Sequence, residues 1–327
     1  MRNLCTYTFY NLKDRFFKFQ LEKKTGISCL PYGGISPLHT IKEYAGKKVL
    51  SGDELQKELI QRIKSNTPFM IARFGTVELN FIKAFDFRMQ KIYENNLNLL
   101  ENNAGFFPHN LKLGFRFVSL MKEAMAECDL LLTQCIRLED YYIKHYMSNL
   151  SYLSHIRNIE PQSYPNQPWT SALENKKVLI IHPFTETIIK QYQKRELLYP
   201  NTNILPKFEL CTLKSIQTIA KTKDNRFKDW FEALDYMYNK ALNINFDIAI
   251  IGCGAYGFPL ASMLKKAGKS TIHIGGVTQS LFGIKCKRFD EAPDYENIRS
   301  FYNDHWVYPS NNETPLNAKN VENGCYW

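Results

Sequence analysis

The sequence predicts an α/β protein with a Rossmann-like, doubly wound, mostly parallel sheet and helices on both faces. Short runs of aliphatic and β-branched residues alternate with longer stretches whose apolar residues recur at helical spacing, which is typical of a parallel sheet covered on both sides. One such unit carries three glycines at G-x-G-x-x-G spacing between its strand and its helix, as phosphate-binding units do. The composition, with 44% hydrophobic and 23% charged residues, is that of a folded globular protein.

The predicted elements alternate along the whole main domain. Strands are expected at residues 69–73, 129–133, 177–182, 208–212, 247–251 and 271–274. Helices are expected at residues 53–64, 76–85, 111–127, 185–194, 230–242 and 258–266. Ligands of such sheets bind beyond the carboxyl ends of the strands, so the residues that follow each strand are the first candidates for a site.

Residues 1–47 form a basic, aromatic N-terminal arm. Residues 1–50 hold nine Lys and Arg against three Asp and Glu, which is +6 of the net charge of +10. Within residues 1–24, Phe and Tyr are interleaved with Lys and Arg, a pattern of helices that lie in a membrane interface. The alternative is a helix packed on the domain with a solvated basic face.

The protein is expected in the cytoplasm, with peripheral contact at the inner face of the membrane through residues 1–24 left open. No run approaches the roughly 18 to 20 apolar residues that span a bilayer, and the start lacks the apolar core of a secretory signal. The positive charge suits an anionic partner. No nucleic-acid-binding motif accompanies it, so nucleic acid is not an expected partner.

Residues 48–327 are expected to form the main domain, with possible halves at 48–160 and 170–327. The segment 160–169, E-P-Q-S-Y-P-N-Q-P-W, is rich in proline and marks a long connection between the halves. It is expected to act as a hinge or as a loop on the acceptor side of a site.

The glycine turn after residues 247–251 is the clearest candidate for a phosphate site. Gly252, Gly254 and Gly257 allow close backbone approach, and the N-terminus of the following helix attracts phosphate oxygens. Tyr256 within the turn is expected to stack on uracil or to pack beneath the loop. The alternative is that the glycines only permit tight packing of the strand on the helix.

Cations follow the next strand, where a dinucleotide-binding site would have a carboxylate. No acidic residue follows residues 271–274 to hold a ribose, and the cations are Lys285, Lys287 and Arg288. They suit a diphosphate better than the adenosine ribose of NAD. An NAD(P)-dependent oxidoreductase is therefore an alternative to a nucleotide-sugar enzyme and not the leading hypothesis.

The end of the first strand offers a second candidate. Arg73, Gly75, Thr76 and Glu78 follow it, where Thr76 can cap the next helix and Glu78 lies in its first turn. Arg73 suits phosphate, and Glu78 suits a divalent cation or a substrate hydroxyl. A plain helix start is the alternative.

Several motifs together resemble the GT-D-fold family of glycosyltransferases from bacterial capsule and exopolysaccharide clusters. The resemblance covers roughly residues 48–327. The motifs are R-F-G-T-V-E after the first strand, N-N-A-G-F-F-P at 102–108, G-C-G-A-Y-G-F-P at 252–259, H-I-G-G followed by T-Q-S-L-F-G-I-K, N-D-H-W-V-Y-P-S at 303–310 and V-E-N-G-C-Y-W at 321–327.

The resemblance implies transfer of a sugar from a nucleotide diphosphate sugar, usually a UDP-sugar, with Mn²⁺ or Mg²⁺. The family's metal motif is Asp-x-Glu in an R-F-G-D-x-E context, so Glu78 matches the glutamate, and Arg73 and Gly75 match the flanking residues. Thr76 stands where the aspartate is expected. A neutral hydroxyl is a weak ligand for these cations, so this departure puts metal binding in doubt.

Further candidates lie near other predicted strand ends. Glu186, at the start of a helix, joins Glu78 as a candidate catalytic base, while Asn102, Asn103 and His182 are candidate contacts for the sugar or the acceptor. Plain alternatives are a helix start for Glu186, a turn for the two asparagines and a satisfied buried histidine for His182.

The leading hypothesis is a glycosyltransferase that moves a hexose from a nucleotide diphosphate sugar, with a UDP-sugar expected, to a saccharide or lipid-linked acceptor of surface polysaccharide. One alternative is the NAD(P)-dependent oxidoreductase. The other is a non-catalytic nucleotide-sugar-binding subunit of a polysaccharide assembly complex.

Overall fold

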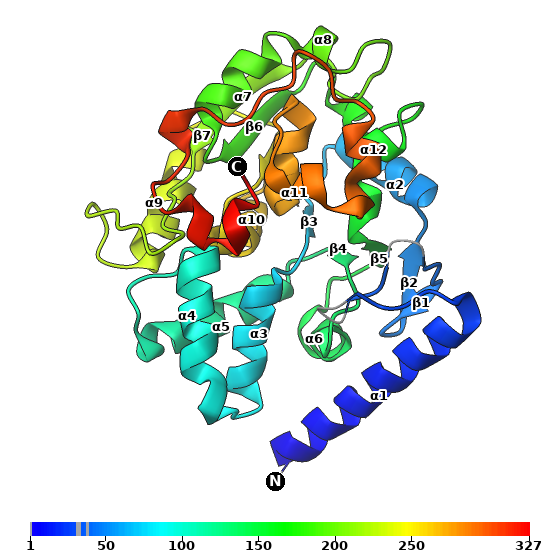
Figure 1. Ribbon diagram of the computed structural model, residues 1–327, viewed down its shortest axis with the longest axis vertical. Helices are drawn as coiled ribbons and strands as arrows, with labels where there is room; N and C mark the ends of the chain where they lie inside the picture. Colours follow the sequence, from blue (N-terminus) through cyan, green and yellow to red (C-terminus); the bar gives the residue numbers. More distant parts are fainter. Residues whose placement is uncertain (1, 31–33, 37–38) are drawn as a thin grey trace.

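The computed structural model confirms the predicted α/β fold, and it describes residues 2–30, 34–36 and 39–327. Within these residues, nine strands form one sheet in the order β1-β2-β5-β4-β3-β9-β8-β6-β7. Every neighbouring pair is parallel except β1 with β2. Helices lie on both faces of this sheet (Figure 1).

All six predicted strands are present, and three further strands were not predicted. The strands are β1 (Glu43–Tyr44), β2 (Lys47–Leu50), β3 (Met70–Ala72), β4 (Leu130–Thr133), β5 (Tyr152–His155), β6 (Lys177–His182), β7 (Glu209–Lys214), β8 (Ile248–Ile251) and β9 (Ser270–His273). The unpredicted strands β1, β2 and β5 are short and half polar, so their sequences carry little strand signal.

The six predicted helices are also present. The α-helices are α1 (Arg2–Thr25), α2 (Gly52–Ser65), α3 (Thr76–Asp86), α4 (Tyr93–Ala104), α5 (Leu111–Met125), α6 (Glu139–Tyr146), α7 (Thr185–Tyr192), α8 (Arg195–Leu198), α9 (Trp230–Leu242), α10 (Gly257–Lys266), α11 (Lys287–Glu291) and α12 (Glu296–Arg299). Short 3₁₀ turns are η1 (Gln90–Ile92), η2 (Ile156–Ile159), η3 (Pro161–Ser163), η4 (Trp169–Leu173), η5 (Gly254–Tyr256), η6 (Gly275–Phe282), η7 (Pro293–Tyr295), η8 (Asn311–Glu313), η9 (Ala318–Asn320) and η10 (Glu322–Gly324).

Alternate residues of the strands supply two separate cores. Leu179 and Ile181 of β6 belong to the core under α3, α5, α9 and α10. Val178 and Ile180 of the same strand belong to the core under α2 and α7. Because successive side chains of a strand point to opposite faces, the continuous aliphatic run of β6 is buried on both sides, as expected for a parallel sheet.

The sheet is continuous across the two expected halves. Strands β1 to β5 precede the proline-rich segment, β6 to β9 follow it, and β3 pairs with β9 in the middle of the sheet. Trp169, at the end of that segment, is fully buried, and its indole donates to Ile159 O at 2.8 Å. The end of the segment is therefore packed against the domain, and its role as a hinge or as a loop on the acceptor side of a site stays a prediction.

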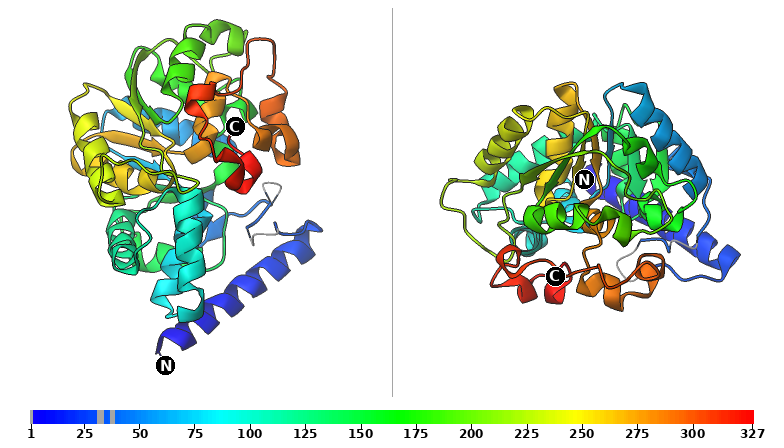
Figure 2. Two further views of the ribbon diagram at one scale, coloured as in Figure 1. Left: turned by 60° about the vertical axis from the view of Figure 1, so that its left-hand side comes forward. Right: turned by 90° about the horizontal axis from the view of Figure 1, so that it is seen from above.

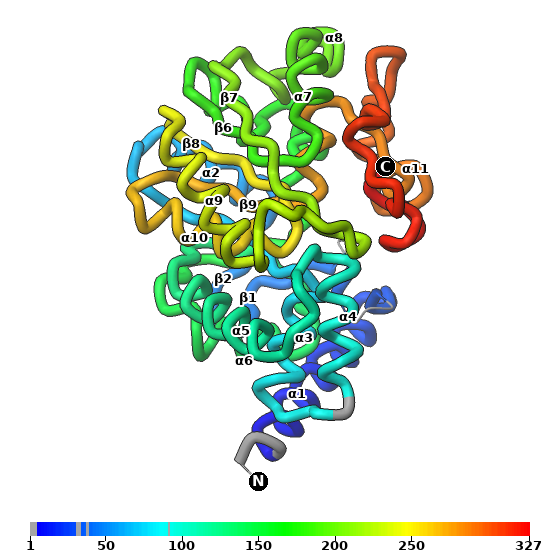
Figure 3. Tube along the Cα trace, turned by 90° about the vertical axis from the view of Figure 1, so that its left-hand side faces the viewer, coloured from blue at the N-terminus to red at the C-terminus, as the bar shows by residue number. Residues whose placement is uncertain are grey.

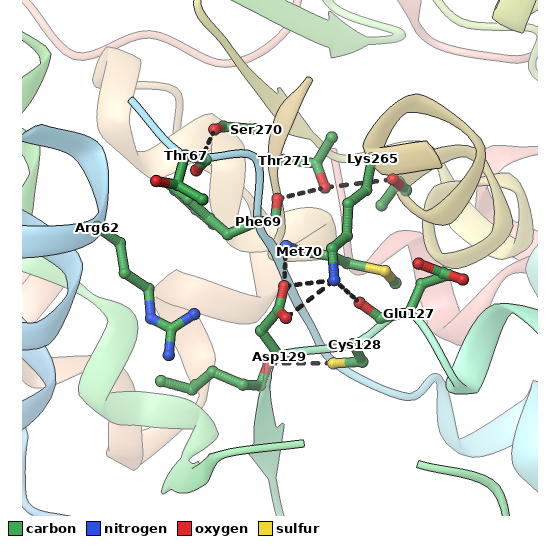
Figure 4. Close-up of polar contacts among 12 residues, drawn as sticks. Arg62, Thr67, Phe69, Met70, Glu127, Cys128, Asp129, Lys265, Ser270 and Thr271 are labelled. Atoms are coloured by element: carbon green, nitrogen blue, oxygen red, sulfur yellow. Dashed lines mark hydrogen bonds and ion pairs between the residues drawn. The ribbon is translucent and has the colours of Figure 1, made fainter. Parts of the chain in front are cut away.

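A polar network closes the amino-terminal edge of the sheet (Figure 4). The Asp129 carboxylate accepts from Met70 N at 2.7 Å and from Lys265 Nζ, which also donates to Glu127 O at 2.6 Å. Thr271 Oγ1 donates to Phe69 O at 3.4 Å. These contacts tie β3, β4 and β9 together at the edge opposite to the candidate site.

The strand order creates a switch point between β6 and β8. From β6 the chain proceeds through α7 to β7 on one side, and from β8 it proceeds through α10 to β9 on the other. At such a point the two connections diverge and leave a crevice beyond the carboxyl ends of the strands. A site is therefore expected at the carboxyl ends of these two strands.

The N-terminal helix α1 lies at the periphery, outside the layers formed by the sheet and its covering helices (Figures 2 and 3). Its inner side packs on the body, where the Tyr10 ring lies 5.1 Å from that of Tyr141. Lys13 pairs with Asp140 at 3.4 Å. None of the helices that the structure describes is both long and apolar enough to cross a bilayer.

Candidate functional site

Two hollows meet at the carboxyl edge of the sheet. The first hollow lies at the β6–β8 switch point and is lined by His182, Phe184, Thr218 and Gly252, among others. The second hollow is lined by the ends of β3 and β5 and by residues near α11. Six residues line both, namely Arg73, Asn103, Ala104, Gly254, Gly276 and Tyr326.

The two hollows differ in size and character. The second has a volume of about 560 Å³, within the range of about 300–1,000 Å³ that is usual for small-molecule sites. The first is a narrow slot of about 80 Å³. Together they form one bent cleft, which we call the carboxyl-edge cleft.

Arg73 lies at the junction of the two hollows. It directly follows β3, and its Nη1 donates to Phe74 O at 3.0 Å. A side chain at Gly275 would come within 2.7 Å of Nη2, so this glycine makes room for the guanidinium. Arg73 forms no ion pair with any residue that the structure describes, and it is therefore available to a planar anion such as phosphate.

Glu78 lies in the first turn of α3 and lines the second hollow. Its carboxylate folds back over Gly75, where an added Cβ would be only 1.8 Å from Oε2, so only glycine fits there. Desolvation raises the pKa of Glu78, and the nearby Arg73 opposes the shift. A carboxyl group with a raised pKa in a cleft suits proton transfer.

The three glycines of the turn have different roles. A Cβ at Gly252 would lie 2.6 Å from Gly275 O, and one at Gly257 would lie 2.2 Å from the His273 ring. Those two glycines are required by packing, as the plain alternative proposed. Gly254 has φ +57° and lines both hollows, so it is the glycine that brings backbone to a ligand.

Tyr256 packs beneath the loop. Its ring is buried and stacks on Trp230 with 4.9 Å between centroids, and its hydroxyl lies 3.1 Å from Thr218 Oγ1. The stack on Trp230 occupies one face of the ring, and the residue also lines the first hollow. The packing alternative fits this buried ring, and stacking of Tyr256 on uracil stays a prediction.

His182 ends β6 and forms part of the first hollow. Its Nδ1 accepts from Phe184 N at 3.1 Å, and desolvation lowers its pKa to about 3. The ring is therefore neutral with its proton on Nε2. It is a buried hydrogen-bond donor and not a base at neutral pH.

Asn102 and Asn103 end α4 beside the cleft. Asn103 lines both hollows, and its Oδ1 accepts from Asn102 Nδ2 at 2.6 Å. Asn102 also donates to Asn320 O at 2.9 Å and so helps to hold the C-terminal segment. Of the two, Asn103 is placed to contact a ligand.

The predicted cations do not act together. Arg288 lines the second hollow, where it pairs with Glu322 and lies 4.6 Å from the Tyr326 ring centroid. Lys285 Nζ lies 5.0 Å from the Tyr302 ring, and Lys287 Nζ donates to Asn323 O at 3.3 Å. Neither lysine lines the cleft.

Glu186 does not reach the cleft either. Its side chain is exposed and pairs with Lys214 at 3.3 Å. The N-terminus of α7 is occupied instead by the buried Glu313 carboxylate, which accepts from Glu186 N at 2.8 Å and from Thr187 N. Glu186 is therefore a surface residue, and its prediction as a catalytic base is wrong.

Several cleft residues were not predicted from the sequence. His155 ends β5, Arg157 and Glu160 follow it, and all three line the second hollow. The Arg157 guanidinium lies 3.6 Å from the Tyr295 ring centroid and pairs with Glu160. Burial raises the pKa of Glu160 to about 7 although Arg157 opposes it. The sequence signal for these residues is the polar side chains that follow residues 152–155. It indicates a site only if residues 152–155 are known to form a strand.

The donor set does not fit a divalent cation at this edge. Within the described part of the chain, no group of three or more His, Cys, Asp or Glu is arranged to hold a metal ion. Glu78 lies beside the Arg73 cation, and the neighbouring Thr76 supplies only a neutral hydroxyl. Hard cations are held largely by ligand charge, and two further carboxylates of the second hollow, Glu160 and Glu322, are already paired with arginines.

The geometry therefore indicates an anion-binding cleft at the switch point of a doubly wound sheet. Comparison of the chain with family models, with curated proteins and with solved structures gave no match.

Proposed function

We propose that the protein is a glycosyltransferase that moves a hexose from a nucleotide diphosphate sugar, expected to be a UDP-sugar, to a surface-polysaccharide acceptor. The observation that carries the proposal is the unpaired Arg73 at the junction of two hollows, beside the positive-φ turn at Gly254. A guanidinium and the backbone of the exposed Gly254 lie together there, and arginine and backbone groups of this kind suit a diphosphate.

The shape of the cleft suggests how a donor lies in it. The base would lie toward the first hollow, with the His182 Nε2–H and Thr218 as polar contacts, and the ribose at the junction of the two hollows, because the volume of about 80 Å³ is too small for both. The diphosphate would lie at Arg73 and Gly254. The second hollow then receives the hexose and the acceptor hydroxyl, within reach of Glu78 and Arg288.

Glu78 is the proposed base for an inverting displacement. The acceptor oxygen attacks the anomeric carbon, its proton passes to the Glu78 carboxylate, and the bond from that carbon to the diphosphate oxygen breaks with its electron pair. Arg73 and Arg288 stabilise the departing diphosphate. The raised pKa of Glu78 makes the carboxylate a stronger base than a solvated glutamate.

No step of this proposal passes through a metal ion, because the donor set at Glu78 does not fit one. The Mn²⁺ or Mg²⁺ requirement that the resemblance implies stays a prediction. Transfer assayed with and without Mn²⁺, in the wild type and in Thr76→Asp, tests it. Cation dependence that appears only in Thr76→Asp would agree with the missing ligand charge.

The central test compares two glutamates that both begin helices. Glu78→Gln is expected to lower transfer from UDP-sugars by roughly a hundredfold or more, the usual range for a catalytic base, with UDP affinity nearly unchanged. Glu186→Gln is the matched control and should keep full activity, because Glu186 lies outside the cleft. Full activity of Glu78→Gln would remove Glu78 from catalysis.

A second test concerns the diphosphate. Arg73→Gln should lower UDP affinity by roughly tenfold or more, since a charge-assisted pair contributes about 1.5–3 kcal/mol. Arg195→Gln, a surface control paired with Glu196, should bind UDP normally. UDP binding without transfer or donor hydrolysis in the wild type would favour the non-catalytic binding subunit.

An NAD(P)-dependent oxidoreductase is the second candidate function. It is suggested by the unit of β8, the glycine turn, α10 and β9, which has the form of a dinucleotide-binding unit. Ile274, Gly275 and Gly276 follow β9, so no carboxylate stands where the ribose of NAD would be held. Titration with NADH and with UDP separates the two candidates. Tight NADH binding without UDP binding would select the oxidoreductase.

We also propose that the enzyme lies in the cytoplasm at the inner face of the membrane, where a lipid-linked acceptor is accessible. Residues 1–24 would supply the peripheral contact. Fractionation of cells into soluble and membrane material, with and without these residues, checks this location.

A further inference from the structure

Helix α1 has two apolar faces, and only one of them is used within the protein. Tyr10, Asp14 and Leu21 are buried on the inner face. The Tyr10 hydroxyl lies 3.2 Å from His145 Nε2, and Tyr10 belongs to a small core with Phe87 and Leu138. The inner face therefore fixes α1 to the body without any contribution from the opposite face.

The opposite face exposes four large apolar side chains. Phe9, Leu12, Phe16 and Phe19 are 62%, 60%, 60% and 62% exposed, and we call them the outer stripe. Their spacing of three and four residues places them in one row along the helix. A row of this kind on a globular protein marks an interaction surface.

The charges beside the outer stripe are all positive. Arg15, Lys23 and Lys24 are exposed, and at 100° per residue Arg15 flanks the stripe while Lys23 continues its line. Lys13 flanks the other side of the stripe and is paired with Asp140 of the body at 3.4 Å. The acidic residues of α1 are engaged elsewhere. Asp14 pairs with Lys18 at 2.7 Å, and Glu22 accepts from Cys29 N at 2.7 Å.

We propose that the outer stripe docks on an anionic lipid bilayer, with α1 lying flat in the interface. Aromatic and leucine side chains would enter the region between headgroups and acyl chains, while the flanking cations contact anionic headgroups. This inference concerns a different surface from the carboxyl-edge cleft and does not depend on the proposed transferase activity.

The charge pattern favours a bilayer over a second copy of the chain. Two outer stripes packed face to face would bring the exposed cations of both helices together, and no exposed carboxylate on the described part of α1 is available to pair with them. Like charges placed together oppose association. An anionic bilayer instead complements both the apolar row and its cationic borders.

Flotation of the full-length protein with vesicles tests the proposal. The wild type should float with phosphatidylglycerol-containing vesicles and much less with pure phosphatidylcholine. A variant with Phe9→Ser, Leu12→Ser, Phe16→Ser and Phe19→Ser should lose roughly tenfold or more of its vesicle binding. Its thermal unfolding should stay close to that of the wild type, because the replaced side chains are exposed.

The matched control replaces four exposed apolar residues elsewhere. Its substitutions are Ile189→Ser, Leu197→Ser, Leu242→Ser and Leu316→Ser, at positions that are 42%, 50%, 39% and 104% exposed. This control should bind vesicles as the wild type does. If the control and the stripe variant lost vesicle binding equally, the loss would be a general effect of surface hydrophobicity. This result would overturn the assignment of the outer stripe as the docking surface.

The cations are tested separately. Arg15→Gln, Lys23→Gln and Lys24→Gln together should weaken binding to anionic vesicles by about fivefold for each charge removed, and added salt should weaken wild-type binding. The control with Lys57→Gln, Lys64→Gln and Lys190→Gln, which are exposed on other helices, should bind normally. Equal wild-type binding to neutral and anionic vesicles would contradict the charge argument.

Size-exclusion chromatography with light scattering tests the other possible partner of the outer stripe, which is a second copy of the chain. A monomeric wild type that binds vesicles agrees with the proposal. A dimer that dissociates in the stripe variant, together with no vesicle binding by the wild type, would overturn it and assign the outer stripe to a second copy of the chain.

Discussion

At the residue scale, the chemistry of the cleft depends on a few side chains with unusual surroundings. Arg73 has a backbone carbonyl as its hydrogen-bond partner, and Glu78 is desolvated beside it. The neighbouring glycines Gly75 and Gly275 make room for these two side chains. Among the described residues Arg73 forms no ion pair, and the carboxyl group of Glu78 has a raised pKa. Both groups are available to a ligand, unlike the paired charges of the surface.

The first prediction concerns Gly254. Gly254→Val is expected to lower UDP affinity by roughly tenfold or more, because a β-branched residue is strained at φ +57° and its Cβ would lie 3.1 Å from Ala104 O at the junction of the hollows. Gly268→Val is the matched control, since Gly268 has φ +82° and nothing within 4 Å. Both should lose similar stability, and normal calorimetric UDP binding by a folded Gly254→Val would remove the turn from the site.

The second prediction concerns Lys83, which is buried and donates to Arg137 O at 3.0 Å. Desolvation lowers its pKa to about 7, assisted by Arg137 and opposed by Glu139. In the unfolded chain its pKa is near 10.4. Between pH 7 and 10 the unfolded state therefore binds more protons than the native state, and Lys83 makes the free energy of unfolding rise with pH.

Comparison with Lys83→Met isolates this effect. The free energy of unfolding of the wild type should increase relative to that of Lys83→Met by about 2–3 kcal/mol between pH 7 and pH 9, at up to about 1.4 kcal/mol per pH unit. Urea denaturation at the two pH values measures it. The exposed Lys64→Met should show no such trend, and a constant difference for Lys83→Met would contradict the lowered pKa.

At the element scale, the C-terminal segment forms part of the cleft and is attached to α7 by hydrogen bonds. The buried Glu313 carboxylate occupies the N-terminus of this helix, where the positive end of the helix dipole favours it. Further along the segment, Tyr326 and Trp327 line the first hollow. The contact at Glu313 therefore helps to position the C-terminal residues that line the first hollow.

The third prediction follows from this contact. Glu313→Ala should lower the free energy of unfolding by about 2–3 kcal/mol, because the N–H groups of Glu186 and Thr187 lose a charged acceptor. Residues 307–327 should then be cleaved faster in limited proteolysis, and UDP affinity should change because the tail lines the first hollow. Glu186→Ala, on the exposed side of the same turn, should change neither, and unchanged proteolysis of Glu313→Ala would contradict the role of this cap.

At the scale of the whole molecule, one sheet joins both halves of the main domain. Pairing of β3 with β9 places strands from either side of the proline-rich segment next to each other. The cleft lies on this joint, because Arg73 follows β3 and Gly254 follows β8. The site therefore requires both halves to be folded.

The fourth prediction is that the main domain unfolds in a single transition. Urea unfolding followed by tryptophan fluorescence and by far-ultraviolet circular dichroism should give coincident curves, because Trp169 and Trp230 belong to the cores on opposite faces of the same sheet. A Trp230→Phe variant, whose remaining tryptophans Trp169, Trp306 and Trp327 all belong to the core under α2 and α7, should show the same midpoint shift by both probes. Two separate transitions would show that the halves 48–160 and 170–327 unfold independently.

The sequence by itself determined the fold class, the six principal strands and the glycine turn. These features are encoded locally, because a run such as K-V-L-I-I-H in β6 is apolar enough to require burial on both faces. It also placed Arg73, Glu78, Asn103 and Gly254 at strand or helix ends, and the structure brings these four to one cleft.

Only the tertiary structure decided which strands are neighbours, and therefore which strand ends form the cleft. The short strand β5 is a strand because it lies between β2 and β4, and its pairing brings Arg157 and Glu160 to the site. Glu186, Lys285 and Lys287 follow the same local patterns as the cleft residues, yet they lie outside it. Contacts between residues more than a hundred positions apart, such as Glu313 with Glu186, depend on strand order and chain path, which local sequence patterns do not encode.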